Sequence, residues 1–291
     1  FGSNRPRWAA NFFNNIKKER TNEMERQGRL NLTQFLKNGT VKKTGIIKEE
    51  NRPHRLKREA WALDVAKSQG LNVPSVLDYF LDNASNEVLI LEKIEGVTLD
   101  KKNIKIRGKA LGLIGQQMMR LSGVCKKYGW IDPDSLTGTY ETWKSFLLFF
   151  AQTYGKRLVD SNLLSEKRLQ RVTNKINNFN LNLPFPYLIH RDIKLGNIIY
   201  SDDGNVWIID WENAILGDPL FEMAVFGARN GRNNFWRELL RGYNVEIHKL
   251  NYFVYNLYEA LSLIGLVSFL HKHSLNFKDK IKRLNLLIDT D

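Results

Sequence analysis

The sequence predicts a two-lobed α+β protein, in which a small antiparallel β-sheet lobe with one internal helix precedes a larger, mainly helical lobe. The first lobe is indicated by strand-like apolar runs, two of which flank the turn dipeptide Asn38-Gly39. The second lobe is indicated by long stretches with helical spacing, interrupted by one strand–loop–strand segment. We place the lobes at residues 1–96 and 97–291. A cleft is expected at the junction, near residues 93–98.

Apolar spacing and turn residues define the elements of the first lobe. Residues 7–27 carry apolar side chains at helical spacing, and residues 55–68 form a second helical pattern that Gly70 ends. Asn-Gly between two strand-like runs is the strongest short signal for a β-hairpin, so these runs should pair. The expected strands are residues 30–37, 40–47, 73–80 and 87–94.

Helical periodicity dominates the second lobe. The segment at residues 187–211 is the exception, because it has two apolar runs around an Asp-Asp-Gly turn and should form a hairpin. From residue 221 the chain is again mostly helical. The expected helices before the hairpin are residues 107–127, 142–159 and 165–178.

Three oxygen-bearing side chains should converge at this hairpin. Asp192 and Asn197 precede its first strand and Asp210 ends its second, and a hairpin brings these two ends together. Mg²⁺ prefers oxygen ligands, usually one or two protein carboxylates with phosphates and water, so Asn197 and Asp210 are candidate metal ligands. Asp192 can then accept a proton from an attacking hydroxyl. Lys194 can offset the charge of a transferred phosphate.

Residues 190–197, His-Arg-Asp-Ile-Lys-Leu-Gly-Asn, and residues 209–212, Ile-Asp-Trp-Glu, resemble the catalytic and metal loops of kinases. The Trp-Glu pair and the Gly-Asp-Pro sequence at residues 217–219 resemble the aminoglycoside phosphotransferase and choline kinase branch. The resemblance implies a bilobal protein kinase-like fold and an ATP-dependent phosphotransferase that uses Mg²⁺. GTP is an alternative phosphate donor.

The same resemblance implies a strand lysine paired with a helix glutamate, which together hold the nucleotide phosphates. Glu59 is the helix glutamate, and Lys43 and Lys48 compete for the strand position. Lys43 precedes Glu59 by sixteen residues and Lys48 by eleven, and the longer separation better accommodates a loop and a helical turn. We therefore prefer Lys43. The resemblance also implies three nucleotide-contacting positions: Gly28 in the phosphate loop, and Glu92 and Ile94 at the adenine hinge.

The acceptor is expected to be a small hydroxyl-bearing molecule, such as a sugar, a metabolite or an antibiotic. Only residues 213–216 separate the metal loop from Gly217, and no Ala-Pro-Glu sequence follows, so the segment that lays out a peptide in protein kinases is missing. Residues 229–291 contain 10 basic and 6 acidic side chains. A polycationic aminoglycoside requires an acidic pocket, so a neutral or anionic acceptor is favoured over a polycationic one.

Charge supplies the alternative hypothesis. The chain has 44 Lys and Arg residues and 31 Asp and Glu residues. Its first 72 residues contain 16 basic and 7 acidic side chains. A basic surface favours anionic partners. The alternative is therefore a kinase-fold binding module, or an atypical protein kinase, whose basic first lobe docks an acidic macromolecule such as RNA. The presence of Lys43, Glu59, Asp192, Asn197 and Asp210 favours the enzyme, because a scaffold has no need for all five.

Composition also limits the cellular setting. Hydrophobic residues make up 43% and charged residues 26% of the chain, which is ordinary globular composition. The single cysteine, Cys125, cannot form an intramolecular disulfide. The longest apolar run, residues 257–270, contains Glu259 and is shorter than the ~20 residues of a membrane span. We expect a cytoplasmic protein without a membrane span.

Overall fold

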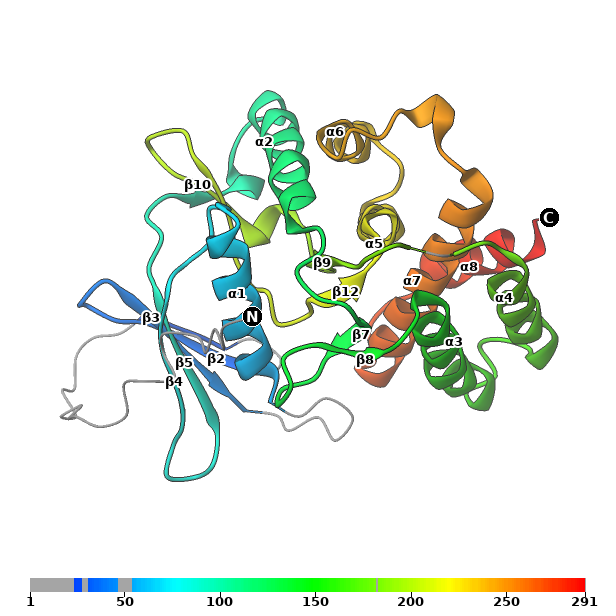
Figure 1. Ribbon diagram of the computed structural model, residues 1–291, viewed down its shortest axis with the longest axis horizontal. Coiled ribbons are helices and arrows are strands. Elements are labelled where there is room, and N and C mark those ends of the chain that lie inside the picture. Colours follow the sequence, from blue (N-terminus) through cyan, green and yellow to red (C-terminus); the bar gives the residue numbers. More distant parts are fainter. Residues whose placement is uncertain (1–23, 28–30, 47–53, 182, 291) are drawn as a thin grey trace. The chain divides into compact units, whose positions relative to one another are not determined.

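The computed structural model describes residues 24–27, 31–46, 54–181 and 183–290 (Figure 1). Within this part of the chain, antiparallel sheets are combined with eight α-helices, which confirms the predicted α+β class.

The described residues form two compact units, each assembled from several chain segments. The first contains the residues up to Lys102 together with 132–136 and 195–214, and the second contains residues 103–131, 137–194 and 215 onward. The expected division at residue 96 differs from this one, because the hairpin within residues 195–214 packs with the first unit.

A five-stranded antiparallel sheet of order β1-β2-β3-β5-β4 forms the first unit's main layer. Asn38-Gly39 makes the predicted turn between β2 and β3, and Gly39 adopts the left-handed conformation (φ +76°) that glycine accommodates without strain. One expectation was wrong: residues 24–27 form strand β1 rather than the end of a helix, and residues 7–23 lie outside the described part. The strands are β1 (Met24–Gln27), β2 (Asn31–Phe35), β3 (Thr40–Gly45), β4 (Val76–Leu81) and β5 (Glu87–Glu92).

Helix α1 (Arg55–Ser68) has the predicted bounds and contacts strands of this sheet. Leu56, Ala60 and Leu63 are fully or almost fully buried, as expected for the apolar face of a helix on a sheet. Gly70 ends the helix with a positive φ of +75° and donates its N–H to the Lys67 carbonyl.

The first unit also contains a three-stranded sheet of order β11-β10-β6. Strands β10 and β11 are the two arms of the predicted hairpin, with Ile198 opposite Ile208. The third strand comes from the residues just after the five-stranded sheet. The strands are β6 (Val97–Thr98), β10 (Ile198–Tyr200) and β11 (Val206–Ile208), and 3₁₀ turns occur at Leu99–Lys101 and Leu195–Asn197.

Helices make up most of the second unit, which also contains a sheet of order β8-β7-β12-β9. The predicted helix at 107–127 is shorter at its end, because α2 stops at Met118 and a 3₁₀ turn leads to β7. The strands are β7 (Tyr128–Ile131), β8 (Gly138–Tyr140), β9 (Tyr187–Ile189) and β12 (Ile215–Gly217). The helices are α2 (Ile104–Met118), α3 (Trp143–Asp160), α4 (Glu166–Asn178), α5 (Pro219–Asn230), α6 (Asn234–Gly242), α7 (Tyr252–Lys272) and α8 (Lys278–Asp289), with 3₁₀ turns at Met119–Leu121 and Ile247–Lys249.

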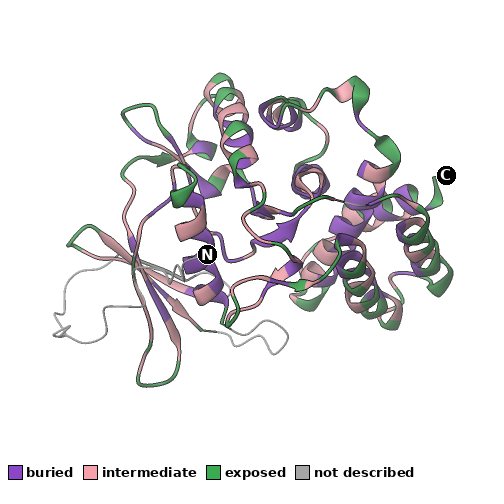
Figure 2. Ribbon diagram, in the orientation of Figure 1, coloured by how far each residue is buried: buried purple, intermediate pink, exposed green. Residues whose placement is uncertain are grey.

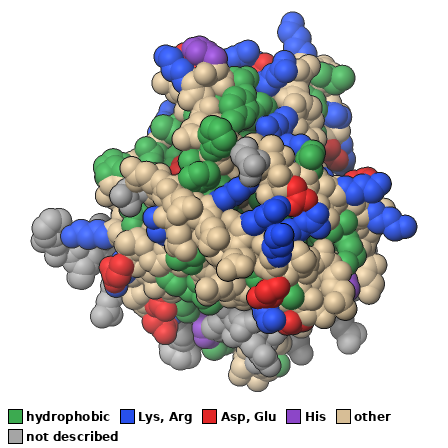
Figure 3. All heavy atoms as spheres, turned by 90° about the vertical axis from the view of Figure 1, so that its right-hand side faces the viewer, with side chains coloured by type: hydrophobic (Ala, Val, Ile, Leu, Met, Phe, Trp, Pro, Cys, Tyr) green, Lys and Arg blue, Asp and Glu red, His purple; other side chains and the backbone are tan. Residues whose placement is uncertain are grey.

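Aromatic side chains from three helices form the core of the second unit. The ring of Trp143 on α3 meets those of Phe221 on α5 and Tyr258 on α7 edge to face, and its indole N–H donates to the Tyr258 hydroxyl at 2.8 Å. In Figure 2 the buried residues run along α5 and α7. The face of this unit in Figure 3 carries more basic than acidic side chains, in keeping with the net charge of +13.

Helix α7 is long and apolar enough to cross a membrane by length and composition alone, with a mean hydropathy of 1.5. More than half of its apolar window is buried inside the structure, against α3, α5 and α8. A buried core helix passes the same test, so the helix is weak evidence for a membrane span.

Candidate active site

The hairpin in the first unit brings Asn197 and Asp210 to the same end. Asn197 is buried and directly precedes β10, and its carbonyl accepts the N–H of Ile209 at 3.0 Å. Asp210 follows at once, with a left-handed backbone (φ +71°) that is uncommon outside glycine. The two candidate metal ligands thus lie just before β10 and just after β11, where a backbone hydrogen bond joins Asn197 to Ile209.

Lys43 lies between two carboxylates. From β3 its ammonium donates to Glu59 Oε1 on α1 at 2.6 Å and to Asp210 Oδ1 at 2.9 Å. Burial lowers the pKa of Lys43, but the charges of Asp210, Glu59 and Glu212 raise it by more, so the lysine stays protonated. The structure therefore joins three of the sequence-predicted residues. The rival Lys48 lies outside the described residues.

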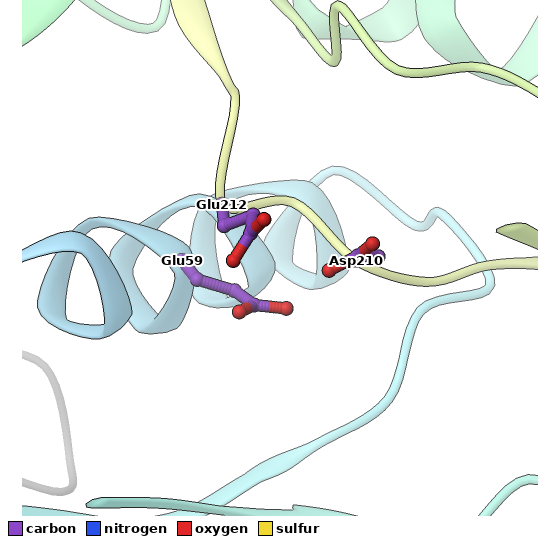
Figure 4. Close-up of side chains that lie close together, drawn as sticks. All are labelled: Glu59, Asp210 and Glu212. Atoms are coloured by element: carbon purple, nitrogen blue, oxygen red, sulfur yellow. The ribbon is translucent and has the colours of Figure 1, made fainter. Parts of the chain in front are cut away.

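Glu59, Asp210 and Glu212 form an acidic cluster, with one carboxylate oxygen from each residue lying within 4.8 Å of the others (Figure 4). Burial raises the pKa of Glu59, although the neighbouring Lys43 lowers it. The second oxygen of Glu59, Oε2, is buried without a hydrogen-bond partner among the described residues. Carboxylate oxygens are the donors that Mg²⁺ prefers, so this cluster fits a hard divalent cation.

Glu212 is held by two residues from distant parts of the first unit. Its carboxylate accepts the side-chain N–H of Asn31, which begins β2, and lies 3.5 Å from Nε of Arg55 at the start of α1. Arg55 in turn donates to Asn31 Oδ1 at 3.1 Å. All three side chains are buried. The contact of Arg55 was not predicted, because this residue belongs to no motif.

The remaining nucleotide positions lie along the first unit or outside the described part. Glu92 ends β5, and its carboxylate accepts hydrogen bonds from the hydroxyl and N–H of Ser75 and lies 3.6 Å from Lys67 Nζ. Ile94 follows two residues after the end of this strand. Gly28 lies outside the described residues, and the described chain resumes at Asn31.

Asp192 lies in the second unit, in the loop after β9, and its side chain is only 6% exposed. Lys194 donates to Asp192 Oδ2 at 2.9 Å, so the structure brings these two predicted residues together. The other carboxylate oxygen accepts a hydrogen bond from Arg229 at the end of α5. The backbone N–H of Asp192 donates to Nδ1 of the buried His190, which gives that histidine a structural role in the loop.

Glu222 on α5 fixes the backbone of this loop. Its fully buried carboxylate accepts the N–H groups of His190 and Arg191, the latter at 2.9 and 3.0 Å. Arg191 has a left-handed backbone (φ +62°), and its guanidinium lies over the Trp130 ring, 4.7 Å from the centroid. Glu222 could not be predicted as the residue that braces this loop, because it follows the loop by about thirty positions in the sequence.

Substitution of Glu222 should change how stability depends on pH. Burial raises the pKa of Glu222 from 4.5 to about 7, so the folded chain holds this proton more tightly than the unfolded chain. The resulting stabilisation is present below pH 4.5 and is lost as the pH rises through about 7. At 1.36 kcal/mol per pKa unit, this loss is about 3 kcal/mol in the wild type, and it should be absent from Glu222→Gln.

Urea unfolding of both proteins at pH 5 and pH 8 measures this effect. The free energy of unfolding should change less between pH 5 and pH 8 in Glu222→Gln than in the wild type. The contribution of Glu59 to this change is the same in both proteins and therefore cancels. Equal differences in the two proteins would show that Glu222 has an ordinary pKa.

Several solved structures are similar to this chain. A thermostable mutant of aminoglycoside phosphotransferase APH(4)-Ia, in a ternary complex with AMP-PNP and hygromycin B, has a TM-score of 0.72 at 17% identity, covering 92% of this chain and 93% of the other. The GDP and kanamycin complex of APH(2")-IIia has a TM-score of 0.66 at 14% identity, covering 94% and 93%. At sequence identities this low, the similarity shows that the chain shares the fold of these proteins and shows nothing of its substrate.

Comparison of the sequence with curated proteins found no significant match. The sequence does match the model of the phosphotransferase enzyme family, APH, over residues 28–260. This range covers most of the chain, including the cluster around Lys43 and the loop around Asp192. The chain therefore belongs to the phosphotransferase enzyme family, as its motifs predicted.

Proposed function

We propose that the protein transfers the γ-phosphate of ATP to a hydroxyl group of a small molecule. The main support is the position of Lys43 between Glu59 and Asp210, because a buried lysine fixed by two carboxylates can bind nucleotide phosphate oxygens. The similar structures support a nucleotide substrate, since they are complexes with ATP, ADP, AMP-PNP or GDP. ATP is the proposed phosphate donor, and GTP is the alternative donor that the experiment below also tests.

Each predicted residue has a defined role in this proposal. Lys43 binds phosphate oxygens, and Glu59 holds its ammonium in place. Asn197 and Asp210 would hold Mg²⁺, which supplies positive charge to the phosphates when bound. Asp192 accepts the hydroxyl proton while the acceptor oxygen bonds to the γ-phosphorus and the bond to ADP breaks. Among the remaining positions, Lys194 offsets charge on the transferred group, and Gly28, Glu92 and Ile94 contact the nucleotide.

The acceptor is proposed to be neutral or anionic. The similar structures are named with hygromycin B, streptomycin or kanamycin, all bound to those other proteins. In this chain, 10 basic side chains against 6 acidic ones follow residue 228, a charge balance that disfavours a polycation.

A phosphate-transfer screen tests the proposal. Hydroxylated sugars, metabolites and antibiotics are incubated with Mg-ATP or Mg-GTP, and nucleoside diphosphate and phosphorylated product are measured. The Lys43→Met variant keeps the apolar stem but loses the charge, and should lower turnover by ~10² or more. Lys42→Met is the matched control, because neighbouring residues on a strand point to opposite faces. A larger loss in Lys48→Ala than in Lys43→Met would assign the nucleotide lysine to position 48.

Transfer to no acceptor, together with salt-dependent RNA binding, would contradict the proposal and favour the binding module.

A further inference from the structure

Two partly exposed cations bind the carboxylate of Asp192. Lys194 contacts Oδ2 and Arg229 contacts Oδ1, so each oxygen has a cationic donor. The side chains of Lys194 and Arg229 are 45% and 33% exposed, whereas that of Asp192 is 6% exposed. This arrangement places a net positive charge beside the proposed base, where an arriving acceptor can meet it.

The backbone of Arg229 is fixed from a second helix. Lys280 on α8 donates its ammonium to the carbonyls of Ala228 and Arg229, at 2.8 Å each, and so caps the end of α5. A cation is favourable at this point, because helix C-terminal carbonyls carry partial negative charge. The guanidinium is therefore carried by the last turn of α5, whose carbonyls are bound by Lys280.

Around Arg229, the described side chains include more cations than carboxylates. Glu259, which is 2% exposed, is bound by Arg232 at 2.6 Å and by Arg283 at 3.0 Å. The described charged groups of this neighbourhood are the cations Arg191, Lys194, Arg229, Arg232, Lys280 and Arg283 and the carboxylates Asp192, Glu222, Glu259 and Asp279. An added ammonium group would increase the excess positive charge, whereas a phosphate or carboxylate would balance it.

We infer that Arg229 recognises an anionic group, a phosphate or a carboxylate, on the hydroxyl-bearing acceptor. This inference rests on the proposed phosphotransferase function and names the acceptor class. The anionic group takes the guanidinium away from Asp192 Oδ1, and that oxygen then accepts the hydrogen bond of the acceptor hydroxyl. The base is thus covered by Arg229 until an acceptor of the right charge arrives, which limits transfer of phosphate to water.

Acceptor pairs that differ by one anionic group test this inference. Ribose is compared with ribose 5-phosphate and glycerol with glycerate, and kanamycin is the cationic member. The anionic member of each pair should have the higher kcat/KM in the wild type. Arg229→Gln should lower the preference for the anionic member, measured as the ratio of its kcat/KM to that of the neutral member, by about 30-fold, the loss expected from breaking a charge-assisted pair. Arg229→Lys should restore part of the loss.

Arg241→Gln is the control, because Arg241 is exposed and pairs with Glu238 on its own helix. This variant should phosphorylate every acceptor as the wild type does. An equal loss for neutral and anionic acceptors in Arg229→Gln would overturn the inference and reduce Arg229 to a residue that positions Asp192. Turnover of kanamycin in preference to every anionic compound would also overturn it while leaving the phosphotransferase function intact.

Calorimetry provides a readout that does not need turnover. Ribose 5-phosphate and glycerate are titrated into the wild-type protein and into Arg229→Gln. Binding of either compound to the wild type, weakened about 30-fold in the variant, supports the inference. Absence of binding to the wild type for both compounds, or equal binding to both proteins, overturns it. Failure of the proposed function is recognised separately, as nucleotide-dependent phosphorylation of no compound in the panel, kanamycin included.

Discussion

Asp192→Asn should bind Mg-ATP within about threefold of the wild type yet phosphorylate its acceptor ~10² times more slowly or worse. Asparagine keeps the size and hydrogen-bonding shape of the side chain but cannot take the hydroxyl proton. General-base assistance typically contributes ~10²–10⁴-fold, which sets the size of the loss. Nucleotide binding is spared because Lys43, Glu59 and Asp210 belong to other segments of the chain.

Turnover and melting temperature are measured on the same preparation of Asp192→Asn. Asp160→Asn is the control, because that carboxylate is 62% exposed and pairs with Lys156 one turn earlier in its own helix. If Asp192 merely braced its loop, the variant would melt at a lower temperature and remain fully active per folded molecule. That result would end the assignment of Asp192 as the base.

Asp210→Asn should abolish metal-dependent turnover, with a loss of about 10³-fold or more, since charge stabilisation by a bound metal ion contributes several kcal/mol. The substitution removes one of the three charges of the acidic cluster and one of the two carboxylates bound to Lys43. Unlike Asp192→Asn, it should also weaken nucleotide binding in the presence of Mg²⁺.

A Mg²⁺ titration of nucleotide binding and of turnover separates this effect from a general loss of structure. Asp202→Asn is a matched control, because it makes the same change in the exposed turn of the same hairpin. Turnover of Asp210→Asn at the wild-type rate and at the same Mg²⁺ concentration would rule out Asp210 as a metal ligand.

The sequence predicted those helices and strands that are determined by residues close together in the chain. The β2–β3 hairpin was found because Asn38-Gly39 has a turn conformation of its own, and the bounds of α1 followed from its spacing and from Gly70. Strand β12 was missed because it has three residues and pairs with β7 and β9, which are distant in sequence. A three-residue strand is too short to show an alternating pattern of apolar and polar residues, so its pairing could not be predicted.

The site shows the same limit. Lys43, Glu59 and Asp210 could be named because they belong to recognisable motifs. The contact of Arg55 with Glu212 could not, because the two are far apart in sequence and an isolated arginine indicates no partner. Arg229 was counted only as one of ten bases after residue 228, and its contact with Asp192 depends on where α5 ends.

The separation of Lys43 and Asp210 by 167 residues affects how the protein emerges from the ribosome. At ~5–20 residues per second, roughly 10–30 s pass between synthesis of the lysine and synthesis of its second carboxylate. Until then β3 and α1 can assemble, but Lys43 has only Glu59 as a partner and the β10–β11 hairpin does not yet exist. The nascent first unit must therefore wait, incomplete, for residues 195–214. Chaperones that bind exposed strands have that interval in which to act on it.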